Sequence, residues 1–260
     1  MTLAQSRFFP DLVARYPRAP SIALCRVPEL ELLSAVTLQP PVLDHCCGDG
    51  WIAGQAFPSR VLEAGVDISR PALAQAAAAG RYLHTEWGDA GRELPFGTAS
   101  FRTVFNNSGI EHIPDLDRAI AEIARVLAPG GRLHINVLNR RYFERWPLSP
   151  ESLQAYRTFQ PFLHALDEVE WSAVLTRHGF EPPSFADYFA PDVSRVLAEL
   201  DYTYSAHYLG HAWSLRVVRD RVTPGSVLRR RIVESLGPLS WEALPGSGSG
   251  FLITAVRRAA

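Results

Sequence analysis

The chain has 260 residues, of which 47% are hydrophobic, 20% are charged and 10% are aromatic, a composition that supports a large apolar core and excludes a disordered chain. The 26 basic and 27 acidic residues leave a formal net charge of −1, so there is no overall positive field to attract nucleic acid or an anionic membrane. The sequence contains no lysine, which excludes chemistry that needs a catalytic lysine.

Cysteine usage and hydropathy indicate a protein of a reducing compartment. The three cysteines, Cys25, Cys46 and Cys47, are too few for a disulfide framework, and two of them are adjacent. The N-terminal segment lacks the basic and apolar stretches of a signal peptide, and no apolar run is long enough to span a bilayer. We therefore expect a cytoplasmic protein that is not inserted in a membrane.

Strand and helix alternate along most of the chain. The first 40 residues are expected to form short helices, because prolines interrupt their apolar pieces. The predicted strands are residues 41–46, 61–68, 82–86, 101–107, 133–137 and 251–256. Since alternating strands and helices build parallel sheets covered on both faces, the fold class is predicted to be α/β.

Three helices between these strands carry start or stop signals. Ser69 is placed to cap the first. Asp115 can cap the second, whose apolar residues recur at helical spacing through Leu127 and which is expected to stop at residues 129–131, a Pro-Gly-Gly sequence. Asp167 begins the third, with a glutamate three residues later in a capping-box arrangement.

Two stretches, roughly 140–165 and 190–245, do not follow this alternation. Both are rich in tyrosine, tryptophan, histidine and arginine. We expect them to form a cap over the carboxyl edge of the sheet, because ligands of open parallel sheets bind there.

A glycine-rich turn follows the first predicted strand. Gly48 and Gly50 lie between that strand and a helix, where glycine permits positive φ and close approach of the backbone to a ligand. The following helix N-terminus offers free N–H groups to an anion. The spacing to Ala53 also fits the dinucleotide-binding fingerprint, and a turn without any ligand is the alternative interpretation.

Two carboxylates follow the next two strands. Asp67 ends the second strand, where a carboxylate can accept hydrogen bonds from both hydroxyls of a ribose. Asp89 follows the third strand and could accept the exocyclic amine of an adenine, although the Gly88-Asp89 pair is also ordinary turn chemistry. Together with Asp44 they form a constellation suited to a nucleoside.

A nicotinamide enzyme and a metal site are the competing interpretations. The nicotinamide alternative shares the glycine turn and Asp67 but leaves Asp89 unexplained. His45, Cys46 and Cys47 are adjacent on a strand and point to opposite faces, so they cannot converge on one ion. We predict no metal site.

These segments, in this order, resemble class I S-adenosylmethionine-dependent methyltransferases of the small-molecule, methyltransferase type 11-like kind. The resemblance is carried by VLDHCCGDG, GVDIS, NNSGIEHIPDLD and EIARVLAPGGRL, within residues 41–139. It implies a Rossmann-like, doubly wound, mostly parallel seven-stranded sheet with an antiparallel C-terminal strand and helical cap insertions. It also implies S-adenosyl-L-methionine as cofactor and a single methyltransferase domain over residues 1–260.

The resemblance also implies roles for individual residues. The cofactor-binding residues would be Asp44, Cys46, Gly48, Gly50, Asp67, Ile68, Asp89, Ala90 and Asn106. His112, on the loop after the fourth strand, is the candidate general base, and a structural hydrogen bond within that loop is the alternative. Candidates for the acceptor pocket are Tyr142, His164, Tyr202, Tyr204, His207 and His211.

The chain departs from the family pattern at two positions. The family usually has glycine where Cys46 stands, so a requirement for positive φ at that position would make this residue unfavourable. The family usually has aspartate where Arg102 stands, and we interpret this as surface variation.

The predicted function is methylation of a small organic molecule at oxygen, nitrogen or carbon by in-line transfer. The alternatives are an RNA or protein methyltransferase and a non-catalytic homologue that binds the cofactor. The near-even charge favours a small-molecule acceptor and no nucleic-acid or membrane partner. The acceptor, the atom methylated and the oligomeric state are left open.

Overall fold

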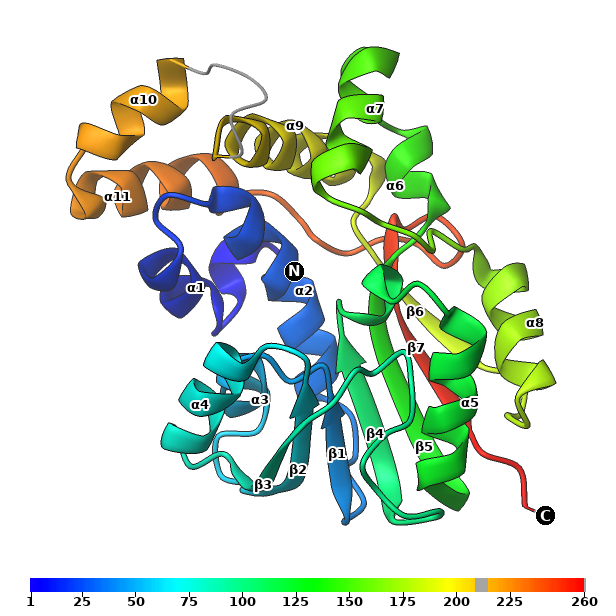
Figure 1. Cartoon of the computed structure of the whole chain (residues 1–260). Helices are drawn as coiled ribbons and strands as arrows, with labels where there is room; N and C mark the ends of the chain where they lie inside the picture. Colours follow the sequence, from blue (N-terminus) through cyan, green and yellow to red (C-terminus); the bar gives the residue numbers. More distant parts are fainter. Residues whose placement is uncertain (209–214, 260) are drawn as a thin grey trace. The chain divides into compact units, whose positions relative to one another are not determined.

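The computed structural model describes residues 1–208 and 215–259 (Figure 1). Its strands are β1 (Val42–His45), β2 (Leu62–Asp67), β3 (Tyr82–Trp87), β4 (Phe101–Asn107), β5 (Leu127–Leu138), β6 (Ser184–Tyr188) and β7 (Gly250–Val256). Its α-helices are α1 (Phe9–Arg15), α2 (Pro20–Ser34), α3 (Trp51–Ala56), α4 (Arg70–Ala78), α5 (Leu116–Val126), α6 (Arg140–Glu144), α7 (Pro150–Phe159), α8 (Glu168–Arg177), α9 (Pro191–Tyr208), α10 (Leu215–Val222) and α11 (Gly225–Leu236). Two short 3₁₀ helices are η1 (Leu3–Gln5) and η2 (Ile110–His112).

The chain divides into two compact units. The sheet unit contains Leu32–Leu138, Leu163–Ala186 and Phe251–Ala260. The helical unit contains Met1–Glu31, Asn139–Phe162 and Asp187–Gly250. The N-terminal helices and the two stretches that interrupt the strand–helix alternation therefore belong to the same unit, a grouping that the sequence pattern does not show.

The seven strands form one sheet in the order β3-β2-β1-β4-β5-β7-β6. The pairs β1–β2, β1–β4, β2–β3 and β4–β5 are parallel, and the C-terminal strands are antiparallel. The predicted α/β, Rossmann-like fold with an antiparallel end is thus confirmed. Because β1 lies between β2 and β4, the chain reverses its direction of progress across the sheet there, at the place where such sheets bind ligands.

Apolar periodicity accounts for the core of the sheet unit. Leu133, Ile135 and Val137 alternate along β5 and are all buried. The apolar side of α5 packs into the same cluster, which also contains Trp171 and Leu175 of α8 (Figure 1).

The predicted helix starts are confirmed. The Ser69 side chain accepts a hydrogen bond from a backbone N–H of the first turn of α4, and Asp115 does the same for α5. At α8 the Asp167 carboxylate accepts from the N–H of Glu170, whose side chain bonds back to the Asp167 N–H.

Helix α5 stops before residues 129–131 as predicted, but the next strand begins earlier than predicted. The helix ends at Val126, Leu127 is already extended, and residues 129–131 lie inside β5. A proline disfavours helical geometry in the residue before it, so the chain turns extended ahead of Pro129. Gly130 and Gly131 then pair with Arg257 through backbone hydrogen bonds of 2.8 and 2.9 Å, which use them as strand residues.

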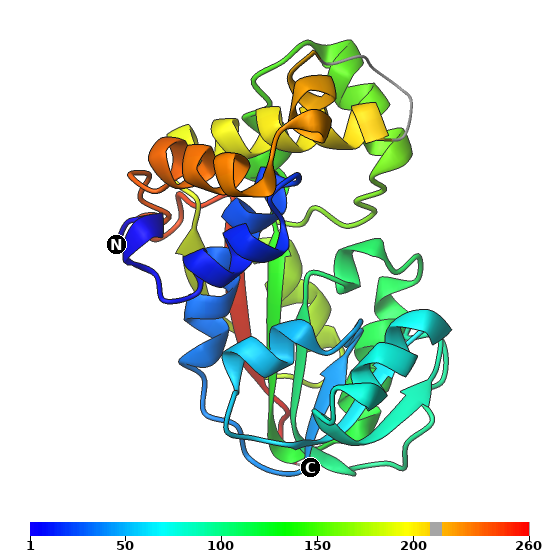
Figure 2. The ribbon, with the colours of Figure 1, turned by 90° about the vertical axis from the view of Figure 1, so that its left-hand side faces the viewer.

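The N-terminal segment forms short helices as predicted, although Pro28 lies inside α2 without ending it. It is bound to the C-terminal part of the helical unit by backbone hydrogen bonds. The N–H of Leu3 donates to Leu239 O at 2.8 Å and that of Ala4 to Gly237 O at 3.0 Å. Figure 2 shows the same association of the N-terminal helices with α11.

Candidate functional site

The turn after β1 has the backbone geometry that glycine provides. Gly48 and Gly50 have φ of 55° and 74°. A Cβ atom added to Gly50 would lie 2.9 Å from Tyr82 Cε2, so packing excludes a side chain there. A Cβ atom added to Gly48 would meet nothing within 4 Å. Gly48 therefore borders open space, and a ligand can approach its backbone.

The Asp67 carboxylate holds this turn at the end of β2. Its Oδ2 accepts from the N–H of Gly48 at 2.8 Å, and its Oδ1 accepts from the N–H of Ser69 at 2.8 Å. Each carboxylate oxygen can accept a second hydrogen bond, and the side chain is half-buried. Asp67 is therefore oriented by backbone donors and still has acceptor capacity for a diol.

Ile68, Asp89 and Ala90 lie where the other nucleoside contacts are expected. Ile68 is 61% exposed, which makes an apolar surface next to Asp67, whereas Ala90 is buried. Asp89 Oδ1 accepts from the N–H of Gly91 at 3.0 Å, and its Oδ2 lies 3.2 Å from Arg92 Nε. The turn chemistry of Asp89 is present, and a contact with adenine stays a prediction.

Asp44 is enclosed beneath the turn. Its carboxylate is buried and accepts a hydrogen bond from the Tyr82 hydroxyl at 2.7 Å. Burial raises the pKa of Asp44 to about 7; the Asp67 charge adds to this effect and the Tyr82 hydrogen bond opposes it. Near neutral pH this group is thus close to its titration midpoint, unlike an ordinary aspartate.

Asn106 joins β1 to the loop that follows β4. Its buried Nδ2 donates to His45 O at 2.9 Å, and its Oδ1 accepts from the N–H groups of Gly109 and Ile110 at 3.1 and 3.0 Å. Burial lowers the pKa of His45 to about 4, so this neighbouring imidazole is neutral at neutral pH. The amide of Asn106 positions the loop, and a direct contact with the cofactor stays a prediction.

Cys46 occupies a left-handed backbone position, with φ of 64°. The requirement for positive φ is therefore real, and an ordinary L-residue there costs on the order of 1–2 kcal/mol. Gly109 accommodates the side chain, because a Cβ atom added to Gly109 would lie 2.7 Å from Cys46 Cβ. Sequence reasoning missed this pair, since its residues meet only through the pairing of β1 with β4.

The loop that carries His112 is held by two hydrogen bonds from residues 163 and 164. His112 is half-buried at the end of η2, next to the buried Glu111. The N–H of Leu163 donates to Glu111 O at 2.9 Å, and His164 Nε2 donates to Ile113 O at 2.8 Å. The structure thus brings His164 to the same loop as His112.

The other predicted acceptor residues belong to the helical unit. Tyr142 is buried, and the buried Tyr204 donates its hydroxyl hydrogen to Asp220 Oδ2 at 2.6 Å. Tyr202 is half-buried. His207 is in α9 but its side chain lies outside the described part of the chain, as does all of His211. Acceptor contacts by these residues stay predictions.

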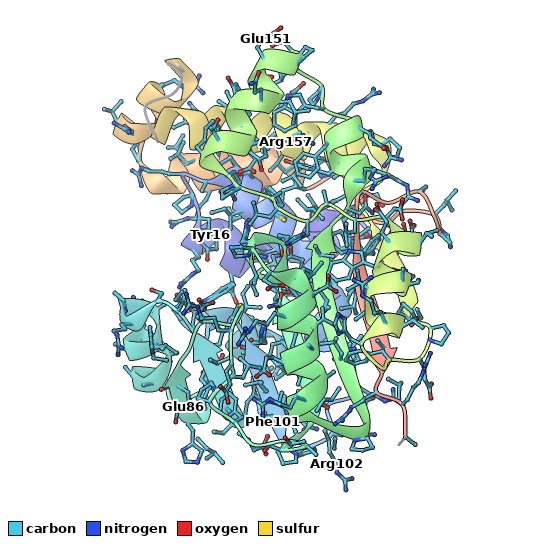
Figure 3. All side chains as sticks on the ribbon, turned by 45° about the vertical axis from the view of Figure 1, so that its right-hand side comes forward. Tyr16, Glu86, Phe101, Arg102, Glu151 and Arg157 are labelled. Atoms are coloured by element: carbon cyan, nitrogen blue, oxygen red, sulfur yellow. The ribbon has the colours of Figure 1, made fainter. Side chains whose placement is uncertain are left out.

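Arg102 is exposed and is the second residue of β4, at the end of the strand opposite the glycine turn (Figure 3). It lies on the surface as predicted, and its interpretation as neutral variation stays a prediction. Within residues 1–208 and 215–259, no group of three or more histidine, cysteine or acidic side chains could hold a metal ion. In the same ranges no helix has both the length and the apolar character needed to cross a bilayer.

The raised pKa of Asp44 predicts a specific pH dependence of stability. The favourable contribution of its neutral form is fully present below the unfolded-state pKa near 4 and is lost as pH rises through about 7. As the pH rises from 4 to 8, the free energy of unfolding of Asp44→Asn should therefore increase relative to that of the wild type, by at most about 4 kcal/mol. Urea unfolding across this range measures the difference, with exposed Glu86→Gln as control. Parallel curves for wild type and Asp44→Asn would contradict the assignment.

The contact between Cys46 and Gly109 predicts a coupled pair. Gly109→Ala should destabilise the wild type by about 1–3 kcal/mol, because its Cβ overlaps that of Cys46. In the Cys46→Gly background the same substitution should cost at least about 1 kcal/mol less. Urea unfolding of the four proteins of this double-mutant cycle gives the coupling. An equal cost in both backgrounds would show that the two side chains do not compete for space.

Comparisons with known proteins agree with this geometry. Residues 43–135 match the family model described as a methyltransferase domain. The demethylmenaquinone methyltransferase of Leptospira interrogans is 36% identical over 99 residues, which are 35% of this chain and 39% of that protein. A malonyl-[acyl-carrier protein] O-methyltransferase of Methylovorus is 30% identical over 187 residues, 66% of this chain and 62% of that protein. The chain thus spans less than two thirds of the length of these relatives.

A solved structure shares the fold over nearly the whole chain. A SAM-dependent methyltransferase from Thermotoga maritima has a TM-score of 0.60 at 18% identity, and the alignment covers 99% of this chain and 100% of that one. The predicted resemblance is therefore confirmed at the level of the matched segment and of the fold. Residues 43–135 match a methyltransferase domain, and the chain has the fold of a solved S-adenosylmethionine-dependent methyltransferase.

Proposed function

We propose that this chain transfers the methyl group of S-adenosyl-L-methionine to oxygen, nitrogen or carbon of a small organic molecule. The observation that carries the proposal is the Asp67 carboxylate, which is bonded to the Gly48 N–H at the carboxyl edge of the sheet, next to open space above Gly48. A nucleoside with a polar tail requires a group that accepts hydrogen bonds from its ribose hydroxyls and a backbone that it can approach closely.

The residues present fit the cofactor. Asp67 would accept the ribose hydroxyls, and the exposed Ile68 would cover one face of the adenine, with Asp89 and Ala90 at its edge. The methionine part would follow the turn, where its contacts would be Asp44, Cys46, Gly48, Gly50 and Asn106. When bound, the cofactor supplies a methyl group already activated by a sulfonium charge.

The protein's part in the reaction is then orientation and exclusion of water. In-line displacement needs the acceptor atom aligned with the methyl, and such alignment can lower a barrier by roughly 7–11 kcal/mol. A base is required only where the acceptor must lose a proton. His112 is the proposed base in that case, because histidine is the most common general base in enzymes and this loop follows the strand beside β1.

The candidates for acceptor binding come from two segments of the sequence, residues 140–165 and 190–245. His164 is held against the His112 loop, and the segments 140–165 and 190–245 supply Tyr142, Tyr204 and His207. The names of the two relatives above describe enzymes that methylate a quinone precursor and a carrier-bound acid, which supports an organic acceptor. The proposal includes a cytoplasmic location.

Two other functions remain in competition. An RNA or protein methyltransferase would carry a basic surface leading to the site and would bind in a salt-sensitive way, and the net charge of −1 disfavours it. A non-catalytic homologue would bind the cofactor without turnover. A screen of small acceptors with methyl-labelled cofactor, read by mass spectrometry of the products, separates these possibilities.

The proposed ribose contact predicts the effect of Asp67→Ala. Losing a charged hydrogen bond costs about 1.5–3 kcal/mol, so the affinity for S-adenosyl-L-methionine should fall at least about tenfold. Isothermal calorimetry measures this, with Glu86→Gln as the matched charge control and circular dichroism to verify folding. An unchanged dissociation constant would remove the nucleoside from this edge of the sheet.

The proposed base predicts a selective effect of His112→Ala. With an acceptor found in the screen, kcat should fall by about 10²–10⁴-fold if that acceptor must be deprotonated, while cofactor affinity changes little. His84→Ala, an exposed histidine on β3, serves as control. Unaltered turnover of an acceptor with a hydroxyl nucleophile would exclude His112 as the base.

A further inference from the structure

The Tyr82 side chain crosses one strand of the sheet to reach Asp44. Tyr82 begins β3 and Asp44 lies in β1, and β2 separates these two strands (Figure 1). The Tyr82 hydroxyl nonetheless donates to Asp44 Oδ2 at 2.7 Å, and both side chains are buried. Burial raises the pKa of Tyr82 well above its ordinary value, so this hydroxyl remains a donor. The edge strand of the sheet thus supplies a hydrogen bond to a candidate cofactor residue two strands away.

Two glycines leave the space that the Tyr82 ring needs. A Cβ atom added to Gly65 of β2 would lie 3.1 Å from both Cδ1 and Cε1 of the ring. In the glycine turn, a Cβ atom added to Gly50 would lie 2.9 Å from Cε2 and 3.4 Å from the hydroxyl oxygen. Carbon atoms pack best at about 3.5–4.0 Å, so a side chain at either position would crowd this ring. The path of Tyr82 to Asp44 therefore depends on glycine both in β2 and in the turn.

The surroundings of Asp44 favour a cationic ligand. In the part of the chain that the structure describes, the Tyr82 hydroxyl is the only hydrogen-bond donor to this carboxylate, and no basic side chain pairs with it. The β4 residue opposite Asp44 is the uncharged Phe105. The other titratable groups around the pair are Asp67 of β2 and three residues of the glycine turn, Cys46, Cys47 and Asp49. Burial raises the pKa of both thiols, so the charges near this pair are negative.

We propose that Tyr82 is a positioning residue for the cofactor, which holds Asp44 as the carboxylate that binds the ammonium group at the amino-acid end of S-adenosyl-L-methionine. The hydroxyl occupies Oδ2 and leaves Oδ1 for the ligand. A donor bonded to one oxygen favours the anion over the neutral acid, and only the anion can pair with an ammonium group. The assignment rests on the proposed function and adds to it a residue that acts through Asp44.

This role predicts how the affinity for the amino-acid end depends on pH. Burial raises the pKa of Asp44 to about 7, and the Tyr82 hydrogen bond opposes that rise. Since the anion is the form that binds, the affinity should be highest above pH 7 and fall as the pH drops through this value. Tyr82→Phe keeps the ring and removes the hydrogen bond that lowers the pKa. The midpoint of the affinity profile should then move upward by about one pH unit.

Two ligands separate the amino-acid end from the nucleoside. S-adenosylhomocysteine carries the ammonium group without a transferable methyl, whereas methylthioadenosine keeps the adenosine and lacks the amino acid. Calorimetry with the whole chain, between about pH 6 and 8.5, measures both affinities. At pH near 7, Tyr82→Phe should weaken S-adenosylhomocysteine about 3–10-fold, and the loss should shrink toward the upper end of this range. Methylthioadenosine should bind the variant as tightly as it binds the wild type.

Three further proteins test whether the effect acts through Asp44. In the Asp44→Asn background, which cannot titrate, Tyr82→Phe should have little further effect on the affinity or its pH profile. Tyr156→Phe also removes a buried hydroxyl that donates to an aspartate, in the helical unit, and should keep the wild-type midpoint. Replacement of Tyr82 by 3-fluorotyrosine, a ring of nearly the same size with a more acidic hydroxyl, should move the midpoint downward.

The outcomes separate the role of Tyr82 from the proposed function. An unshifted midpoint in Tyr82→Phe and the 3-fluorotyrosine protein, or an equal loss of both ligands, would overturn the positioning role and leave the proposed function intact. An equal shift in the Asp44→Asn background would assign the pH dependence to another group and likewise overturn the role. A wild type that binds neither ligand would overturn the proposed function, and with it the assignment of Tyr82.

Discussion

The bond from the Gly48 N–H to the Asp67 carboxylate is the interaction on which the rest of the site depends. It exists because β1 and β2 are parallel and in register, with His45 opposite Val66, so that the turn after one strand ends beside the last residue of the other. The Asp67 carboxylate holds the glycine turn in place, and the Gly48 N–H orients the carboxylate. One pair of neighbouring strands thereby creates both the open backbone turn and the carboxylate to which we assign the ribose.

Most of the sheet unit could be predicted because its signals are local. Ser69, Asp115 and Asp167 cap their own helices, and each cap is visible within four residues of sequence. The early start of β5 was harder to predict, since Arg257, the partner that makes residues 129–131 a strand, is at the far end of the chain. Strand β6 was not predicted because it is short and only Tyr188 among its residues is buried.

The same difference between local and long-range signals applies to the candidate site. Asp67 and the glycine turn follow from strand ends and spacing, which sequence shows. The Tyr82 hydroxyl on Asp44, the Asn106 bridge to His45 and the space that Gly109 leaves for Cys46 depend on strands meeting across the sheet. No local signal marks those three pairs, yet the Tyr82 hydrogen bond moderates the raised pKa of Asp44, and Asn106 positions the His112 loop. Sequence therefore predicts the candidate cofactor residues better than it predicts what orients them.

The aromatic residues of the helical unit show why composition alone could not assign an acceptor. The sequence does not distinguish Tyr142, Tyr202 and Tyr204 from one another, but in the structure Tyr142 and Tyr204 are buried and Tyr202 is half-buried. Methyl transfer from a sulfonium asks the sheet unit only for alignment, so the same sheet can serve many acceptors. Selectivity for an acceptor must then come from side chains outside the cofactor turn, and such side chains carry no local sequence signal of their own.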